Sequence, residues 1–154
     1  MSKSVQIKIQ APTVLDIFCG AGGMSLGFQN AGCNILGGID NNPHAVRTHQ
    51  RNFPNSILRL AERDISSIDL RKLPIKPNEV DILIGGPPCQ VFSRVGIGKM
   101  KSLGKQIEED IRNFLYKDFV RCLHYYKPLF FVMENVDYLL KKITLFQKYL
   151  RVLN

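Results

Sequence analysis

Five short apolar segments alternate with helix-like or polar stretches along the chain, and this alternation constrains the fold more than any other feature of the sequence. The segments are residues 14–18, 35–39, 57–60, 80–84 and 129–133. Strands that alternate with helices predict an α/β fold with a doubly wound parallel sheet and right-handed crossovers. If the first strand is central, the strand order reverses between the first and fourth strands. Ligands bind where the order reverses, at the carboxyl ends of the strands.

Length, composition and charge describe one soluble domain with an anionic partner. A chain of 154 residues is long enough for a single domain. No apolar run approaches the roughly 20 residues of a membrane span, and no signal-peptide core follows the N-terminus. We therefore expect a cytoplasmic protein with no membrane partner, nucleoid-associated if the source is prokaryotic. The net charge of +8 favours nucleic acid as the partner. The spacing of the four cysteines predicts neither a metal site nor a disulfide framework.

The first two apolar segments form a unit that is typical of nucleoside-binding proteins. Residues 19–23, Cys-Gly-Ala-Gly-Gly, predict a tight turn between the first strand and a helix over residues 24–31. Glycines allow a ligand to lie directly against such a turn. Asp40 ends the second segment, 20 residues after Gly20. A carboxylate at about that separation accepts hydrogen bonds from ribose hydroxyls.

A second helix is predicted over residues 44–52, with Pro43 in its first turn and Asn41 or Asn42 as its cap. His44 and His49 lie on this helix among polar neighbours, which predicts surface or rim positions rather than catalysis. Farther along, Asp64 follows the third segment. Asp64 suits contact with the base of a nucleoside, and it equally suits a cap or turn beside Ser66 and Ser67.

The fourth apolar segment ends abruptly at residues 85–90, Gly-Gly-Pro-Pro-Cys-Gln, which cannot continue a strand. A thiol at the end of a parallel strand faces the crevice where ligands collect, so Cys89 is a candidate nucleophile. A buried structural cysteine beside a proline turn is the alternative. Residues 91–109 contain several glycines and lysines without periodicity. They predict a mobile basic loop, which either closes over nucleic acid or is a solvated loop with no such role.

The last part of the chain predicts one more helix and one more buried strand. Residues 110–126 place apolar side chains on one helical face, and the strand over residues 129–133 ends at Glu134. Glu134 is expected to face the same crevice as Cys89. Residues 138–154 resemble a helix or a frayed tail.

Together these segments resemble the DNA (cytosine-5) methyltransferases. The similarity runs in the family's order and spacing over residues 13 to about 140. The matching segments are residues 16–28, Asp40, residues 64–65, residues 86–93, residues 110–115 and residues 134–136. The resemblance implies a Rossmann-like methyltransferase fold, incomplete with about five strands, in which residues 1–154 are part of the catalytic domain.

The resemblance also implies S-adenosyl-L-methionine as the cofactor. Asp40 would lie at its ribose, and Asp64 and Ile65 at its adenine. The full set of implied cofactor residues is Phe18, Gly20, Ala21, Gly22, Gly23, Asp40, Asn41, Asp64, Ile65, Gly86, Pro88 and Leu115.

The implied catalytic residues are Cys89 and Glu134. Cys89 would attack carbon 6 of a cytosine so that carbon 5 becomes nucleophilic, and Glu134 would hold and protonate ring nitrogen 3. A thiol with an ordinary pKa of about 8.5 needs a positive setting for this chemistry. The substrate is expected to be double-stranded DNA with the target cytosine flipped out of the helix.

The chain departs from the family after residues 134–136, where only 18 residues follow and contain no Gln-x-Arg-x-Arg segment or target-recognition region. Two explanations stay open: one subunit of a split enzyme completed by a complementary chain, or a truncated and inactive chain. A non-catalytic partner that binds cofactor or DNA is a different class, and retention of Cys89 and Glu134 argues against it. Methylation of an exocyclic amine is disfavoured because that chemistry uses Asn or Asp where this chain has Cys89.

Overall fold

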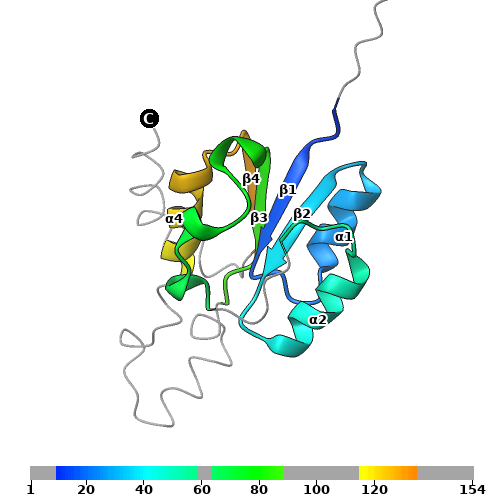
Figure 1. Cartoon of the computed structure of the whole chain (residues 1–154), viewed down its shortest axis with the longest axis horizontal. Coiled ribbons are helices and arrows are strands. Elements are labelled where there is room, and N and C mark those ends of the chain that lie inside the picture. Colours follow the sequence, from blue (N-terminus) through cyan, green and yellow to red (C-terminus); the bar gives the residue numbers. More distant parts are fainter. Residues whose placement is uncertain (1–9, 59–63, 89–114, 135–154) are drawn as a thin grey trace, which may run out of the picture.

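The computed structural model describes residues 10–58, 64–88 and 115–134, and these form a parallel sheet with helices on both sides (Figure 1). The described strands are β1 (Thr13–Ile17), β2 (Asn34–Ile39), β3 (Ile82–Gly85) and β4 (Phe130–Met133), in the order β2-β1-β3-β4. All neighbouring strands are parallel. The α/β fold class and the reversal of strand order beside the first strand are therefore confirmed.

The third predicted strand is reduced to one bridge in the described part of the chain. Leu58 pairs in parallel with Gly37 of β2, and the Leu58 N–H donates to the Leu36 carbonyl over 2.9 Å. The β1–β2 register shifts between Val14 and Leu15. Beyond β2, the bridge at Leu58 extends the described sheet on the side of β1 that is opposite β3.

The helices begin and end close to the predicted residues. They are α1 (Gly23–Asn30), α2 (Pro43–Asn52) and α4 (Leu115–Tyr126), with short 3-10 helices η1 (Ile65–Ser67), η2 (Leu70–Lys72) and η3 (Pro77–Glu79). Of the two predicted caps, Asn42 is the cap of α2: its Oδ1 accepts from the His44 N–H at 2.9 Å and the Ala45 N–H at 3.3 Å. None of the helices in the described part is long and apolar enough to cross a membrane.

Two apolar cores lie on opposite faces of the sheet. Leu15 and Ile17 of β1 pack with Phe119 and Leu123 of α4 on one face, whereas Val14 packs in the second core on the other. Successive side chains of a strand point to opposite faces, and a parallel sheet is covered on both. The run of apolar residues in β1 therefore follows from its central place.

The prediction that residues 129–133 form a buried strand is wrong in one respect. The strand exists, but the exposed fractions of Leu129, Phe130, Phe131 and Val132 are 75%, 68%, 38% and 43%. The physical reason is position: β4 is last in the described sheet, and α1 and α2 contact β1 and β2 instead. An apolar pattern predicts a strand that can be covered, but it does not specify what covers it.

Several expectations fall on residues outside the described ranges. These are the end of the third strand, Cys89 and Gln90, the basic loop of residues 91–109, the start of the helix at 110–114, and residues 135–154. They stay predictions.

Close packing of β1 and β3 makes Gly85 a sensitive position. A Cβ atom at residue 85 would collide with the backbone carbonyl of Ile17, which cannot rotate away. We expect Gly85→Ala to lower the free energy of unfolding by about 3 kcal/mol, the upper end for overpacking a core. Urea unfolding followed by circular dichroism measures this change.

Gly27→Ala is the matched control, because a Cβ there meets nothing within 4 Å and residue 27 lies inside α1. It should be neutral or stabilise by about 0.5–1 kcal/mol. Equal stability of the two variants would contradict the described approach of β3 to β1.

Candidate functional site

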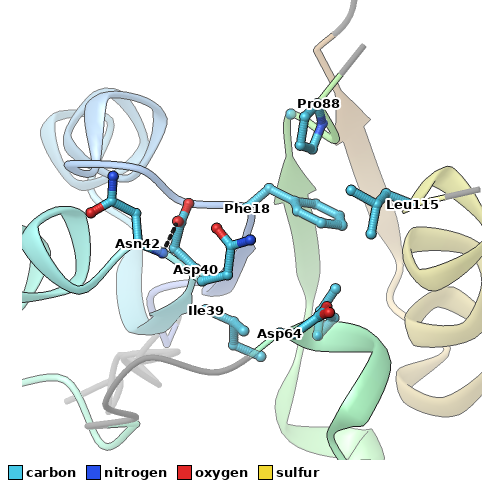
Figure 2. Close-up of a pocket in the computed structure, with 10 residues that line it drawn as sticks. Phe18, Ile39, Asp40, Asn42, Asp64, Pro88 and Leu115 are labelled. Atoms are coloured by element: carbon cyan, nitrogen blue, oxygen red, sulfur yellow. Dashed lines mark hydrogen bonds between the residues drawn. The ribbon is translucent and has the colours of Figure 1, made fainter. Parts of the chain in front are cut away.

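A cavity of about 230 Å³ lies at the carboxyl ends of β1, β2 and β3, where the strand order reverses (Figure 2). It is lined by residues from the turn after β1, the end of β2, the start of η1, the segment after β3 and the start of α4. The lining residues are Phe18, Ile39, Asp40, Asn41, Asn42, Asp64, Ile65, Gly86, Pro88 and Leu115.

Phe18 occupies a strained backbone position at the mouth of the turn. Its φ angle is 63°, in the left-handed region that costs a residue with a side chain on the order of 1–3 kcal/mol. Neighbouring hydrogen bonds hold this conformation: the Cys19 N–H donates to Ile39 O at 3.1 Å and the Gly22 N–H to Cys19 O at 2.9 Å. The Phe18 ring consequently points toward Leu115 across the cavity (Figure 2).

Asp40 is fixed by two backbone hydrogen bonds. Its Oδ2 accepts from the Gly20 N–H at 2.9 Å, and its Oδ1 accepts from the Asn42 N–H at 2.8 Å, the bond drawn in Figure 2. Each carboxylate oxygen still has a lone pair free for another donor. The arrangement presents a preoriented acceptor to hydroxyl groups in the cavity.

Asp64 combines the two functions that its sequence position suggests. Its Oδ1 accepts from the Ser66 N–H at 3.0 Å and caps η1, and the same residue lines the cavity. Arg121 of α4 holds η1 in place, because its guanidinium donates to Ile65 O at 2.6 Å and to Ile68 O at 3.1 Å. Nothing in the sequence pattern pointed to Arg121, whose contacts join residues far apart in the chain.

Glu134 lies beside the segment that leads to Cys89. Its N–H donates to Gly85 O at 3.0 Å, and a Cβ placed on Gly86 would lie 3.0 Å from Glu134 Oε2. Glycine at residue 86 therefore leaves space for the carboxylate. Cys89 is outside the described residues, so its distance from Glu134 stays a prediction.

The structure brings most of the predicted cofactor residues around one cavity. Phe18, Asp40, Asn41, Asp64, Ile65, Gly86, Pro88 and Leu115 line it. The predicted residues Gly20, Ala21, Gly22 and Gly23 instead form the turn and the start of α1, and Gly20 contributes by its hydrogen bond to Asp40. Ile39 and Asn42 also line the cavity, although neither was predicted to contact a cofactor. The sequence signal that could have found them is that Ile39 precedes Asp40 and Asn42 precedes Pro43.

The surface position predicted for His49 is wrong, whereas that of His44 is confirmed. His49 is 2% exposed, because the side of α2 that carries it packs onto the turn after β1. Its Nε2 lies 3.1 Å from Ser25 Oγ, which donates to Asp16 Oδ2 at 2.6 Å. The three side chains form a hydrogen-bonded chain between α2, α1 and β1.

Asp16 is the one charged residue in β1 and is fully buried. Burial raises the pKa of its carboxyl to about 7, the Ser25 hydroxyl and backbone lower it in part, and the Asp40 charge raises it. Gly22, the N-cap of α1, provides no side-chain hydrogen bond. The Asp16 carboxyl thus supplies an acceptor beneath the first turn of α1, and a negative charge there once the pH exceeds its raised pKa.

Comparison with known proteins agrees with this geometry. The model of the C-5 cytosine-specific DNA methylases matches residues 12–154. The chain belongs to this family. Membership implies S-adenosyl-L-methionine as the cofactor.

Individual methylases share substantial identity with the chain. The type II methyltransferase M1.HphI of Haemophilus parahaemolyticus is 41% identical over 126 residues, which are 80% of this chain and 32% of that protein. M.HgiGI of Herpetosiphon aurantiacus is 40% identical over 123 residues, 80% of this chain and 89% of its own sequence. A solved structure, described as a prophage-encoded DNA modification methyltransferase of E. coli, has 33% identity and a TM-score of 0.68. It covers 92% of this chain, which spans only 37% of that structure.

The buried carboxyl of this methylase chain predicts a specific pH dependence. Because the pKa of Asp16 is raised, its carboxyl stays protonated in the folded state between about pH 4 and 7. In the unfolded state the same carboxyl is already ionised over this range. The stability that this proton contributes is therefore lost as pH rises through that window. We expect the difference in unfolding free energy, wild type minus Asp16→Asn, to fall by up to about 1.4 kcal/mol per pH unit.

Urea unfolding at several pH values measures this difference. The pKa of His49 is lowered by burial, so His49 contributes stability that grows with pH in both proteins and cancels in the comparison. A constant difference across the window would show that Asp16 keeps an ordinary pKa.

Proposed function

We propose that this chain is the cofactor-binding and nucleophile-bearing part of a DNA (cytosine-5) methyltransferase. The observation that carries the proposal is the cavity at the carboxyl ends of β1, β2 and β3, in a chain that belongs to the C-5 cytosine-specific DNA methylases. Residues 1–154 then form a partial catalytic domain.

The lining residues suit S-adenosyl-L-methionine. The Asp40 carboxylate, already oriented by Gly20 and Asn42, accepts hydrogen bonds from the ribose hydroxyls. Asp64 accepts from the adenine amine, and the apolar surfaces of Phe18 and Leu115 cover the rest of the nucleoside. The glycine turn lets the backbone approach the cofactor closely. The cofactor supplies an electrophilic methyl group on a sulfonium.

Cys89 and Glu134 act on the cytosine. The Cys89 thiolate forms a bond to carbon 6, and the displaced electron pair makes carbon 5 nucleophilic. Glu134 donates a proton to ring nitrogen 3, which prevents negative charge from accumulating on the ring. After carbon 5 has taken the methyl group, a water molecule accepts the carbon 5 proton, the freed electron pair re-forms the carbon 5–carbon 6 double bond and expels the Cys89 thiolate, and ring nitrogen 3 returns its proton to Glu134. This sequence restores the enzyme and leaves 5-methylcytosine.

Double-stranded DNA is the proposed substrate, with the target cytosine flipped out because carbon 6 is inaccessible within the stacked helix. The net charge of +8 favours the phosphate backbone. Flipping brings the base to the edge of the sheet where Glu134 and the segment after β3 lie together.

A complementary chain is proposed to complete the enzyme. The chain spans about a third of M1.HphI, 32% of its length, so most of a methylase of that size lies outside residues 1–154. The exposed apolar side chains Phe130 and Val132 on β4, 68% and 43% exposed, offer a surface for it. β4 is also the last strand of the sheet within the described residues, and a strand in that position has backbone groups ready to pair with another strand.

Two experiments test the proposal in parts. In the first, binding of S-adenosylhomocysteine to the 154-residue chain is measured by titration calorimetry. Asp40→Ala should weaken binding by about tenfold or more, because it removes hydrogen bonds to a charged acceptor. Asp69→Ala is the control, since Asp69 is also a backbone-capping carboxylate but pairs with Arg71 away from the cavity. Equal losses in both variants, or no binding by the wild type, would contradict the assigned cofactor site.

In the second, the chain is incubated with DNA containing 5-fluorocytosine and S-adenosyl-L-methionine, with and without a polypeptide that supplies the rest of a methylase. Fluorine replaces the proton that must leave, so the adduct with the enzyme persists. We expect a covalent complex only with the added polypeptide, and none with Cys89→Ser. Site-specific methylation by the chain alone would refute the need for a partner. Failure to trap any complex with every complementing polypeptide would favour an inactive or purely binding protein.

A further inference from the structure

One side of α2 packs against the glycine turn, residues 19–23, behind the cavity. A Cβ on Gly22 would lie 2.6 Å from Phe53 Cε2 and 2.9 Å from His49 Cδ2, so neither ring leaves room for a larger residue. The two rings contact each other, with centroids 4.6 Å apart. Asn52 Nδ2 donates to Ala21 O at 3.2 Å. Packing and hydrogen bonding thus hold residues 21 and 22 against α2.

His49 also reaches the end of β2. A Cβ on Gly38 would lie 2.7 Å from His49 Nε2 and 2.6 Å from Cys19 Sγ. Gly38 is two residues before Asp40, and Cys19 lies between Phe18 and Gly20 in the turn. The imidazole therefore fills the space between the two segments that carry Phe18 and Asp40 into the cavity.

The hydrogen-bond chain gives the imidazole one orientation. When Asp16 is ionised, the Ser25 hydroxyl donates its only proton to Asp16 Oδ2 at 2.6 Å, so its oxygen is left to accept from His49 Nε2–H across the 3.1 Å between them. Burial lowers the pKa of His49, which favours the neutral ring, and the acceptor at Ser25 then favours the tautomer with its proton on Nε2. The groups facing the ring are Ser25, Cys19 and Phe53, with the charge of Asp40 opposing the effect of burial.

We propose that His49 is a positioning residue of the cofactor site, acting with Ser25 and Asp16 to hold the turn and Asp40 in the binding geometry. His49 does not line the cavity. It acts through Gly22 and Gly38, and the Gly20–Asp40 hydrogen bond of 2.9 Å joins the two segments that it supports. The inference rests on the proposed cofactor site for its functional meaning, whereas the support of the turn is testable without cofactor.

The test compares His49→Gln, His49→Leu and His44→Leu in the 154-residue chain. Glutamine keeps an N–H donor for Ser25, leucine removes it, and His44 lies exposed on the same helix. We expect His49→Leu to weaken S-adenosylhomocysteine binding about tenfold, the effect of losing a buried hydrogen bond, with His49→Gln and His44→Leu near wild type. Unchanged affinity in a folded His49→Leu variant would overturn the proposal.

Exchange of the Gly20 amide proton, followed by NMR without cofactor, separates positioning from the proposed function. We expect faster exchange in His49→Leu than in His49→Gln, because the Gly20 N–H loses its fixed acceptor. If the wild type fails to bind S-adenosylhomocysteine but this difference is present, the proposed cofactor fails while the support of the turn stands. Equal exchange in all variants, with only a lower unfolding temperature for His49→Leu, would show a purely structural role and overturn the inference.

Ser25→Ala is the second variant, for the case in which His49→Leu does not fold. It leaves the imidazole in place but removes the acceptor for Nε2–H. The ¹⁵N shifts of the wild-type ring should report a proton on Nε2, and Ser25→Ala should reduce that tautomer and accelerate Gly20 exchange. A proton on Nδ1 in the wild type would refute the hydrogen-bond chain.

Discussion

The pairing of β1 with a strand on each edge is the constraint on which the described site depends. β1 pairs with β2 on one side and β3 on the other, and apolar cores cover both faces. Its carboxyl end therefore has little freedom, which allows the next residue, Phe18, to adopt a positive φ angle. Because β2 and β3 run parallel to β1, their ends carry Asp40 and Gly86 to the same cavity.

The turn after β1 is supported from behind by a buried polar cluster. Asp16, Ser25 and His49 come from three different elements and are nearly inaccessible to solvent. Buried polar groups are costly unless they are hydrogen-bonded, and these three bond to one another. Oxygen Oδ1 of Asp16 has no partner within the described residues, which accords with the raised pKa of that carboxyl. The cluster links the helices to the strand beneath the site, so a change there is expected to reach Asp40.

Local patterns predicted much of the fold because they depend on neighbouring residues. Asn42 and Pro43 marked the start of α2, and the apolar residues of 14–18 marked a strand buried on both faces. His49 was misplaced because its neighbours in sequence are polar, whereas its neighbours in space are Gly22, Gly38 and Ser25. The exposure of Phe130 was missed for a related reason, since an apolar residue does not identify its covering partner.

The sequence by itself determined the order of strands and helices along the chain, the glycine turn, and the carboxylates at the ends of the strands. It also determined the resemblance to DNA (cytosine-5) methyltransferases. These features depend on short segments whose conformations follow from residue type and spacing. Only the tertiary structure decided that Asp40 is fixed by Gly20 and Asn42, that Glu134 lies against Gly86, and that His49 is buried. Those contacts depend on how parallel strands and helices pack across the sheet, which brings together residues far apart in the chain.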